Sequence, residues 1–283
     1  MPQVKLNLDE INHIVENALF EDVGSGDITT NLLFPDDADC KAIILAKEEG
    51  VVAGLPIAQM VFKKLDKDIL WNEEKRDGDI IKTNQVLAGI SGSQKALLTG
   101  ERVALNFLQR LSGIATLTSR FVEAVHGLPV KILDTRKTVP GLRTLDKYAV
   151  MVGGGNNHRF GLYDGVLIKD NHIKLAGGIF RAVTILRDRT VEETRIEVEA
   201  STIEEVKEAL EAGADVIMLD NMPLNVMREA ISLINKKTLV EVSGGVSLDN
   251  VRTIAEMGVD FISVGFLTHS PRALDMGFYV VSY

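Results

Sequence analysis

Apolar residues recur at helical spacing in two segments of the first half of the chain. Between Asp9 and Phe20 they lie three or four positions apart, and Asp9 is of a residue type that caps helix N-termini. This segment predicts an amphipathic helix. The segment from Lys95 to Leu111 predicts a second, longer helix.

Between these two helices the apolar positions come in short runs rich in β-branched residues. The runs are separated by Glu49-Gly50 and by the Asp-Gly-Asp sequence at Asp77–Asp79, which are typical of tight turns. We therefore expect hairpins of an antiparallel sheet. The expected strands are Ala42–Ala46, Val51–Ala53, Ile69–Trp71 and Val86–Ile90.

After Val130, strand-like and helix-like segments alternate regularly. The strand-like runs are Val130–Leu133, Gly165–Ile168, Arg195–Val198, Val216–Leu219, Leu239–Val242 and Phe261–Val264. The helical stretches are Leu142–Val152, Ile179–Arg187, Ile203–Ala212, Leu224–Asn235 and Leu248–Met257. Repeated strand–helix units require parallel strands joined by right-handed crossovers. Because the chain is too short for eight such units after a first domain, the pattern predicts an incomplete barrel or an open parallel sheet.

Composition and charge narrow the class of protein. The 283 residues are 46% hydrophobic and 25% charged, which is ordinary for globular proteins. A formal net charge of −9 argues against a nonspecific nucleic-acid binder. Cys40 is the single cysteine, Met1–Leu8 lacks the features of a signal peptide, and no apolar run approaches the span of a membrane. We therefore expect a cytoplasmic protein.

The residues that directly follow the strand-like runs are unusually polar. They are Asp134, Lys169, Glu199, Asp220, Ser243 and Gly265. Chemistry in parallel α/β barrels is found at the C-terminal ends of the strands, and charges beside a barrel core need partners. This ring of residues therefore predicts an active site.

Three strand-to-loop junctions in the middle of the chain carry cations. Their cations are Arg136 and Lys137, then His158 and Arg159 after Gly153–Gly155, then Lys169. A single Arg-Lys pair would more often be a solvated loop, and three glycines alone would more often be a flexible linker. Three such junctions close together in sequence favour a binding site. Because arginine pairs bidentately with carboxylates and phosphates, the predicted ligand is polyanionic.

Two carboxylates and two glycine turns complete the candidate set. Glu197 and Glu199 face the same side of one strand, and Glu199 is the better candidate because it is nearer to the C-terminal end. Glu199 and Asp220 are suited to bind Mg²⁺ or sugar hydroxyls, or to stabilise developing positive charge, unless they form a structural ion pair. The turns at Ser243–Gly245 and Gly265 follow the last two strands, where such barrels bind phosphate.

Four segments of the chain resemble the quinolinate phosphoribosyltransferase family. They are Glu21–Thr30, Glu101–Asn106, Leu111–Thr116 and Asp134–His172. The resemblance implies an incomplete seven-stranded α/β barrel at residues 113–267. It also implies an N-terminal α/β sandwich domain at residues 1–112, joined by the tail at 268–283. The implied reaction joins quinolinate to 5-phosphoribosyl 1-pyrophosphate (PRPP) with Mg²⁺, giving nicotinate mononucleotide, pyrophosphate and CO₂ in NAD biosynthesis.

The resemblance also implies a role for each candidate residue. It assigns quinolinate to Arg102, Arg136, His158, Arg159 and Lys169. It assigns PRPP and its Mg²⁺ to Lys137, Glu199 and Asp220. It assigns the 5-phosphate to Ser243, Gly244, Gly245 and Gly265. Arg102 is expected to come from the partner subunit of a homodimer or higher oligomer, and no organic cofactor is expected.

Two other functions remain open from the sequence. A sister phosphoribosyltransferase of the same fold would act on another aromatic acid, but a neutral or monoacid substrate would not need Arg102, Arg136 and Arg159 together. A non-catalytic barrel that senses phosphorylated ligands would keep the glycine turns without needing Glu199 and Asp220. The set of cations and carboxylates therefore favours an enzyme acting on a diacid.

Overall fold

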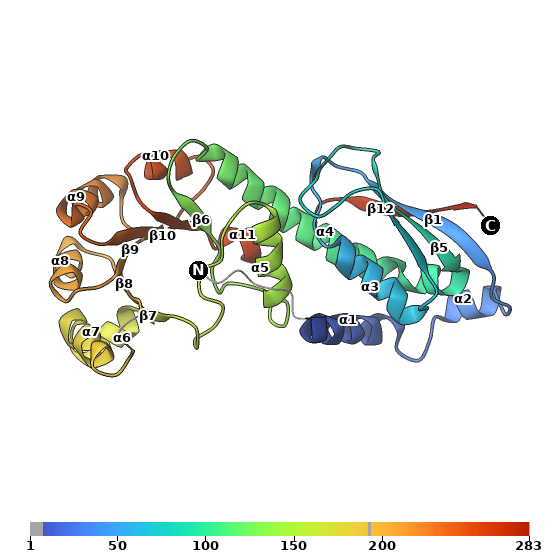
Figure 1. The fold of residues 1–283 in the computed structure, drawn as a ribbon, viewed down its shortest axis with the longest axis horizontal. Coiled ribbons are helices and arrows are strands. Elements are labelled where there is room, and N and C mark those ends of the chain that lie inside the picture. Colours follow the sequence, from blue (N-terminus) through green and yellow to red (C-terminus); the bar gives the residue numbers. More distant parts are fainter. Residues whose placement is uncertain (1–7, 192–193, 283) are drawn as a thin grey trace. The chain divides into compact units, whose positions relative to one another are not determined.

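The computed structural model describes residues 8–191 and 194–282 of the chain (Figure 1). These residues form two compact units, which we describe separately. The antiparallel unit contains residues 8–119, 138–154 and 267–282, and the barrel unit contains residues 120–137 and 155–266 apart from the two undescribed positions. No helix in the described ranges is long and apolar enough to cross a membrane.

A four-stranded sheet organises the antiparallel unit. Its strand order is β12 (Met276–Ser282), β1 (Asp39–Ala46), β5 (Val86–Ser93) and β3 (Leu70–Glu73), with all neighbours antiparallel. Buried and accessible positions alternate along β1, as in a strand with one covered face. The expected antiparallel sheet is therefore confirmed. The strand expected at Val51–Ala53 is only the two-residue β2 (Gly50–Val51), which pairs separately with β4 (Ile80–Ile81).

Helix α3 (Leu55–Leu65) was not expected from the sequence, and it supplies much of this core. It buries Leu55, Ile57, Ala58, Val61 and Phe62. The Phe62 ring stacks on Phe278 of β12 at a centroid distance of 5.9 Å, which joins the helix to the C-terminal strand. Helix α1 (Leu8–Val23), which was expected, packs against α3, and the short α2 (Ile28–Leu33) follows it.

Helix α4 (Gln94–Ala124) is longer than the predicted Lys95–Leu111. The small polar residues after Leu111 do not end the helix because they serve its packing. The hydroxyls of Ser112 and Thr116 accept hydrogen bonds from the backbone N–H groups of Ala53 and Val51, each at 2.9 Å. The unit also contains α5 (Arg143–Val152), and the two units meet in sequence within α4 and α11 (Phe266–His269).

The barrel unit is built on a parallel sheet of six strands. In sheet order they are β6 (Lys131–Leu133), β11 (Phe261–Ser263), β10 (Leu239–Ser243), β9 (Val216–Asp220), β8 (Ile196–Ala200) and β7 (Val166–Ile168). The helices between them are α6 (Asp170–Ala176), α7 (Ile179–Arg187), α8 (Ile203–Glu211), α9 (Leu224–Ile234) and α10 (Val251–Ala255). Figure 1 shows α7, α8 and α9 along the outer side of the strands. The family resemblance implies seven strands, without a position for the seventh; beside β6 the structure has a parallel bridge between Leu133 and Asn156.

The parallel register divides the side chains of these strands between two faces. Along β8, Ile196, Val198 and Ala200 are buried under the helices, while Glu197 and Glu199 point to the opposite face. Registered neighbours share that face, which places Glu241 of β10 on it as well. The expectation of an incomplete barrel is confirmed, and its inner face carries these carboxylates among apolar residues such as Met218 and Phe261.

Candidate active site

The site begins with a buried carboxylate at the end of β6. Asp134 is fully buried, and its carboxylate accepts hydrogen bonds from the side-chain amide of Asn157 and from the backbone N–H of His158, the latter at 2.9 Å. The backbone N–H of Asp134 donates to the carbonyl of Asn156 at 3.1 Å. These bonds attach the segment after the three glycines to β6, and so position His158 and Arg159.

The glycines before this segment are required by packing. A Cβ atom on Gly153 would collide with the carbonyl oxygen of Ala115 and the side chain of Thr118 in α4. Gly154 has a φ of +87°, which disfavours other residues. The alternative of a flexible linker therefore does not describe this part of the chain.

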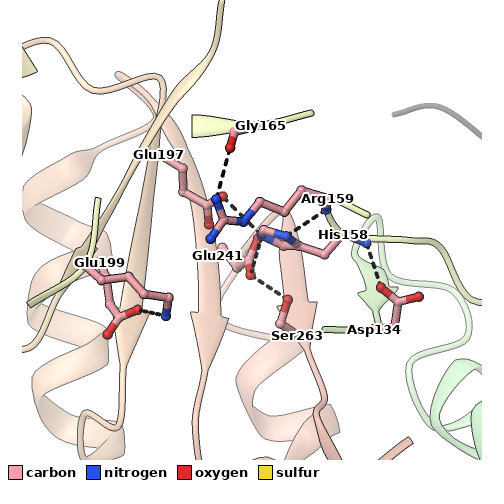
Figure 2. Close-up of polar contacts among 9 residues, drawn as sticks. Asp134, His158, Arg159, Gly165, Glu197, Glu199, Glu241 and Ser263 are labelled. Atoms are coloured by element: carbon pink, nitrogen blue, oxygen red, sulfur yellow. Dashed lines mark hydrogen bonds and ion pairs between the residues drawn. The ribbon is translucent and has the colours of Figure 1, made fainter. Parts of the chain in front are cut away.

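Both ring nitrogens of His158 have protein partners (Figure 2). Nδ1 accepts the backbone N–H of Arg159 at 2.8 Å, so the ring proton lies on Nε2. Nε2 is 3.1 Å from Oε2 of Glu197 and 3.6 Å from Oε1 of Glu241. The hydroxyl of Ser263 donates to Oε1 of Glu241. Four side chains from different parts of the barrel thus meet on its inner face.

Glu241 is the most deeply buried acid of this group, with 1% of the side chain exposed. Burial and the nearby Glu197 raise the pKa of Glu241 to about 8, and His158 and Ser263 only partly oppose that rise. The environment of Glu241 therefore favours the protonated form of its carboxyl group.

Arg159 lies beside a cavity of about 580 Å³. Its Nη1 donates to the carbonyl of Gly165 at 3.0 Å, and the turn between them is closed by Asp164, which accepts the N–H groups of Phe160 and Gly161. Burial and the positive charge of Arg136 lower the pKa of Arg159, while Glu197 and Asp164 raise it. Glu197, His158, Asp164 and Gly165 also line this cavity, together with Asn157, Leu162, Tyr163, Val166, Thr194, Arg195 and Val216.

Two of the predicted residues form an ion pair at the ends of β7 and β8. Nζ of Lys169 lies 2.6 Å from Oε2 of Glu199, whose side chain is only 13% exposed. The alternative of an ion pair for Glu199 is therefore seen in the structure, with a partner that is itself a candidate. Asp220 ends β9 and accepts a hydrogen bond from the side chain of Asn221 at 2.8 Å.

The turn after β10 has an unusual backbone. Gly244 and Gly245 have φ angles of +82° and +64°, and a Cβ atom on Gly244 would collide with the side chain of Asn221. Asn250 closes the turn by donating to the carbonyl of Gly245 at 2.9 Å. Backbone N–H groups in such glycine turns can form an anion-binding concavity.

Two family models match the chain: the N-terminal domain of quinolinate phosphoribosyl transferase at residues 27–112 and its C-terminal domain at residues 114–279. A Bacillus subtilis protein named "Probable nicotinate-nucleotide pyrophosphorylase [carboxylating]" is 45% identical over 96% of this chain and 93% of its own length. The chain belongs to the quinolinate phosphoribosyltransferase family.

Other members of the family agree in sequence and in structure. The chloroplastic nicotinate-nucleotide pyrophosphorylase of Arabidopsis thaliana is 44% identical over 94% of this chain and 82% of its own. The crystal structure of NadC from Streptococcus pyogenes superposes with a TM-score of 0.92 at 41% identity, covering 98% of this chain and 99% of that one. The protein is therefore a decarboxylating phosphoribosyltransferase that converts quinolinate and PRPP to nicotinate mononucleotide, pyrophosphate and CO₂.

The structure brings together some of the predicted residues of this phosphoribosyltransferase and adds others. Arg136, His158 and Arg159 are near one another, and Lys169 contacts Glu199. Lys137 is exposed, with its N–H donating to the Thr135 hydroxyl, and Arg102 is exposed on α4 of the antiparallel unit. Sequence reasoning missed Asp134 as an anchor, gave Asn157 no role of its own within the segment that it singled out, and did not consider Glu241 or Ser263. It considered Glu197 and preferred Glu199.

A signal for Glu241 was present in the sequence. It stands between Val240 and Val242 in a strand that is otherwise apolar up to Ser243. A charge within such a run has to face a partner, because a buried unpaired carboxylate is costly. The partners come from Glu197, His158 and Ser263, which are distant in sequence, so their identity required the structure.

His158, Glu197 and Glu241 are spaced as metal ligands within the part of the chain that the structure describes. Their hydrogen bonds do not fit that role. A histidine that binds a metal through Nε2 carries its proton on Nδ1 and donates it to an acceptor. Here Nδ1 faces the N–H group of Arg159, which is a donor. We therefore assign these residues to a hydrogen-bonded network.

The raised pKa of Glu241 predicts a change in how stability depends on pH. Because the folded pKa of about 8 exceeds the ordinary 4.5, the contribution of Glu241 is fully favourable below about pH 4.5 and is lost as the pH rises toward 8. Glu241→Gln keeps a neutral side chain at every pH. We expect its melting temperature, relative to wild type, to rise by a few degrees between about pH 5.5 and 8.5. An equal difference at both pH values would contradict the protonated state of Glu241.

Proposed function

We propose that Arg136 and Arg159 bind the carboxylates of quinolinate, with Lys169, His158 and Arg102 as further contacts implied by the family resemblance. The observation that supports this assignment is the effect of Arg136 on Arg159, whose partly buried guanidinium has a lowered pKa. Two cations at so short a separation repel each other. An anion bound between them would lower the electrostatic free energy of both. A planar diacid also suits guanidinium groups, which pair bidentately with carboxylates.

Glu199 and Asp220 are proposed to act on the ribosyl carbon. The pyridine nitrogen attacks C1 of the ribose as pyrophosphate leaves, and positive charge develops on the sugar. Carboxylates at the neighbouring ends of β8 and β9 would stabilise that charge. Lys137, exposed after β6, is available to neutralise the leaving pyrophosphate. The positive N-ribosylated pyridinium ring then stabilises the electron pair left on the ring carbon when CO₂ departs, and a proton from water bonds to that carbon to give nicotinate mononucleotide.

Mg²⁺ fits this site as an ion carried mainly by the pyrophosphate group of PRPP. Magnesium keeps several waters and uses one or two carboxylates together with substrate phosphates. Asp220 offers such a carboxylate at a strand end, whereas Glu199 is already paired with Lys169 at 2.6 Å. We therefore propose Asp220 as the nearer group to the ion and Glu199 as an indirect one. The ion would neutralise charge on the leaving group. We propose no organic cofactor.

The 5-phosphate is assigned to the turns after β10 and β11, at Ser243, Gly244, Gly245 and Gly265. The positive φ angles of Gly244 and Gly245 support this assignment, because backbone N–H groups in such a glycine turn can form an anion-binding concavity. We also propose that the enzyme works in the cytoplasm, because a single cysteine allows no intrachain disulfide and suits a reducing compartment.

Arg159→Ala tests the assignment of quinolinate. Removing the charge partner of a desolvated carboxylate costs about 2–5 kcal/mol, which corresponds to a rise of ~30-fold or more in the KM for quinolinate. The KM for PRPP should change far less. Steady-state kinetics with each substrate varied in turn measure both constants, and Arg181→Ala, an exposed arginine of α7, is the matched control. Equal losses toward both substrates would place Arg159 elsewhere.

Asp220→Asn and Glu199→Gln test the proposed stabilisation of the ribosyl cation. Each should lower kcat by about tenfold or more, because it removes an anion that acts in the transition state. Quinolinate binding, measured by calorimetry, should stay nearly unchanged. Glu204→Gln, at an exposed position of α8, controls for the loss of one carboxylate. A variant with wild-type turnover would exclude that residue from the proposed role.

We also propose a homodimer or higher oligomer in which Arg102 enters the active site of the neighbouring subunit. Arg102 is exposed on α4, so it is accessible to a partner, and the alternative is a surface pair with Glu101 or another acid. Mixing inactive Arg102→Ala protein with inactive Lys137→Ala protein tests the sharing of sites. A mixed dimer would contain one site with both changes and one wild-type site, so activity should reappear. No recovery despite demonstrated subunit exchange would mean that each chain builds its own site.

A further inference from the structure

We propose that Glu241 is a positioning residue of this reaction, acting through Glu197 and His158 to fix Arg159 for quinolinate. The inference rests on the proposed assignment of Arg159 to quinolinate. It extends the site to an acid on the inner face of the barrel, and neither the strand ends nor the glycine turns indicated that residue.

The geometry connects the four groups in one chain of contacts (Figure 2). Glu241 of β10 receives the hydroxyl of Ser263 from β11, and it lies beside Glu197 of β8. Glu197 is 3.1 Å from Nε2 of His158, and Nδ1 of the same ring accepts the N–H of Arg159. The contacts therefore run from the centre of the sheet to the backbone of the proposed substrate-binding residue.

The protons in this chain have one consistent arrangement. The N–H of Arg159 donates to Nδ1 of His158, so Nε2 carries the ring proton and donates to Glu197. Glu241 accepts from Ser263, and burial and the nearby Glu197 raise its pKa, which favours the protonated form that can donate to Glu197. Glu197 accepts from His158 and lies close enough to Arg159 to raise the pKa of that guanidinium. Replacing Glu241 would remove a polar group that lies beside both Glu197 and His158, and would free these two side chains to reorient.

Arg159 is fixed at both ends by this arrangement. Its backbone N–H is bonded to His158, and its guanidinium donates to the carbonyl of Gly165 at 3.0 Å. A buried carboxyl is a costly way to fill a barrel core, because an apolar side chain of the same volume would pack without a desolvation penalty. An apolar side chain in place of Glu241 could not make a polar contact with Glu197. Small displacements of a substrate-binding group have large kinetic effects.

Two substitutions of Glu241 separate positioning from packing. Glu241→Met keeps the approximate volume and removes both hydrogen bonds, and we expect it to raise the KM for quinolinate by about tenfold. The KM for PRPP should stay unchanged. Glu241→Gln retains an acceptor for Ser263 and a donor for Glu197, so it should restore kinetics close to wild type. Asp260→Asn is the matched control, since Asp260 directly precedes β11 and its carboxylate accepts the backbone N–H of Val240 at 2.8 Å.

A spectroscopic measurement covers the case in which Glu241→Met folds poorly. The ¹⁵N spectrum of full-length protein labelled at histidine, with the His158 signals assigned through their loss in His158→Gln, reports the ring tautomer. Wild type and Glu241→Gln should show the proton on Nε2, and Glu241→Met or the milder Ser263→Ala should shift that equilibrium. A proton on Nδ1 in wild type would overturn the network.

The outcomes distinguish this inference from the assignment on which it rests. If Arg159→Ala leaves quinolinate binding intact, the assignment of Arg159 fails. If Arg159→Ala weakens quinolinate binding but Glu241→Met does not, only the positioning role fails. Equal effects of Glu241→Met on both substrates, a Glu241→Gln variant as impaired as Glu241→Met, or the same substrate selectivity in Asp260→Asn would each overturn the positioning role.

Discussion

The buried carboxylate of Asp134 is the constraint on which this site depends. One strand of the barrel is reduced to a single bridge, so the segment after the three glycines has little sheet pairing to locate it. Asp134 replaces that pairing with side-chain hydrogen bonds to Asn157 and to the backbone of His158. Bonds from donors to a buried carboxylate are stronger than those between neutral groups, which suits a short segment that has to be fixed accurately. The positions of His158 and Arg159 follow from it.

The inner face of this barrel departs from the apolar layers that fill most barrels of this type. Glu197, Glu199 and Glu241 lie on it, and each would be unfavourable as an isolated buried charge. The structure offsets these charges in different ways: Lys169 pairs with Glu199, His158 donates to Glu197, and the raised pKa of Glu241 favours its neutral form. These buried polar groups lower the stability of the fold, but they provide an interior that can orient polar groups, as is common at functional sites.

Periodicity predicted the elements whose pattern is local. The helix α1 and the alternation of strands and helices after Val130 were visible in the sequence, as were Glu199 and Lys169 at strand ends. The pairing of β12 with β1 was not visible, because it joins opposite ends of the chain. The role of Glu241 could not be predicted from the sequence for a related reason. Its contacts come from separate strands, and the pattern within one strand predicts only the side of the sheet on which a residue lies. The preference for Glu199 over Glu197 followed distance from the strand end, whereas the contact with His158 is made deeper in the barrel.

The chain is acidic, yet both of its substrates are anions. Their binding therefore has to depend on charged groups close to the site and not on the net charge of the chain. The formal net charge is −9, but interactions between exposed charges are screened beyond about 8–10 Å at physiological ionic strength. A substrate at the site therefore responds mainly to nearby groups, among which Arg136 is close enough to Arg159 to lower the pKa of its guanidinium. The protonation of Glu241 matters in the same way, because a second anion beside Glu197 would offset the attraction that these two arginines exert on a diacid. Keeping that acid neutral allows the barrel interior to be polar without cancelling the positive charge at the site.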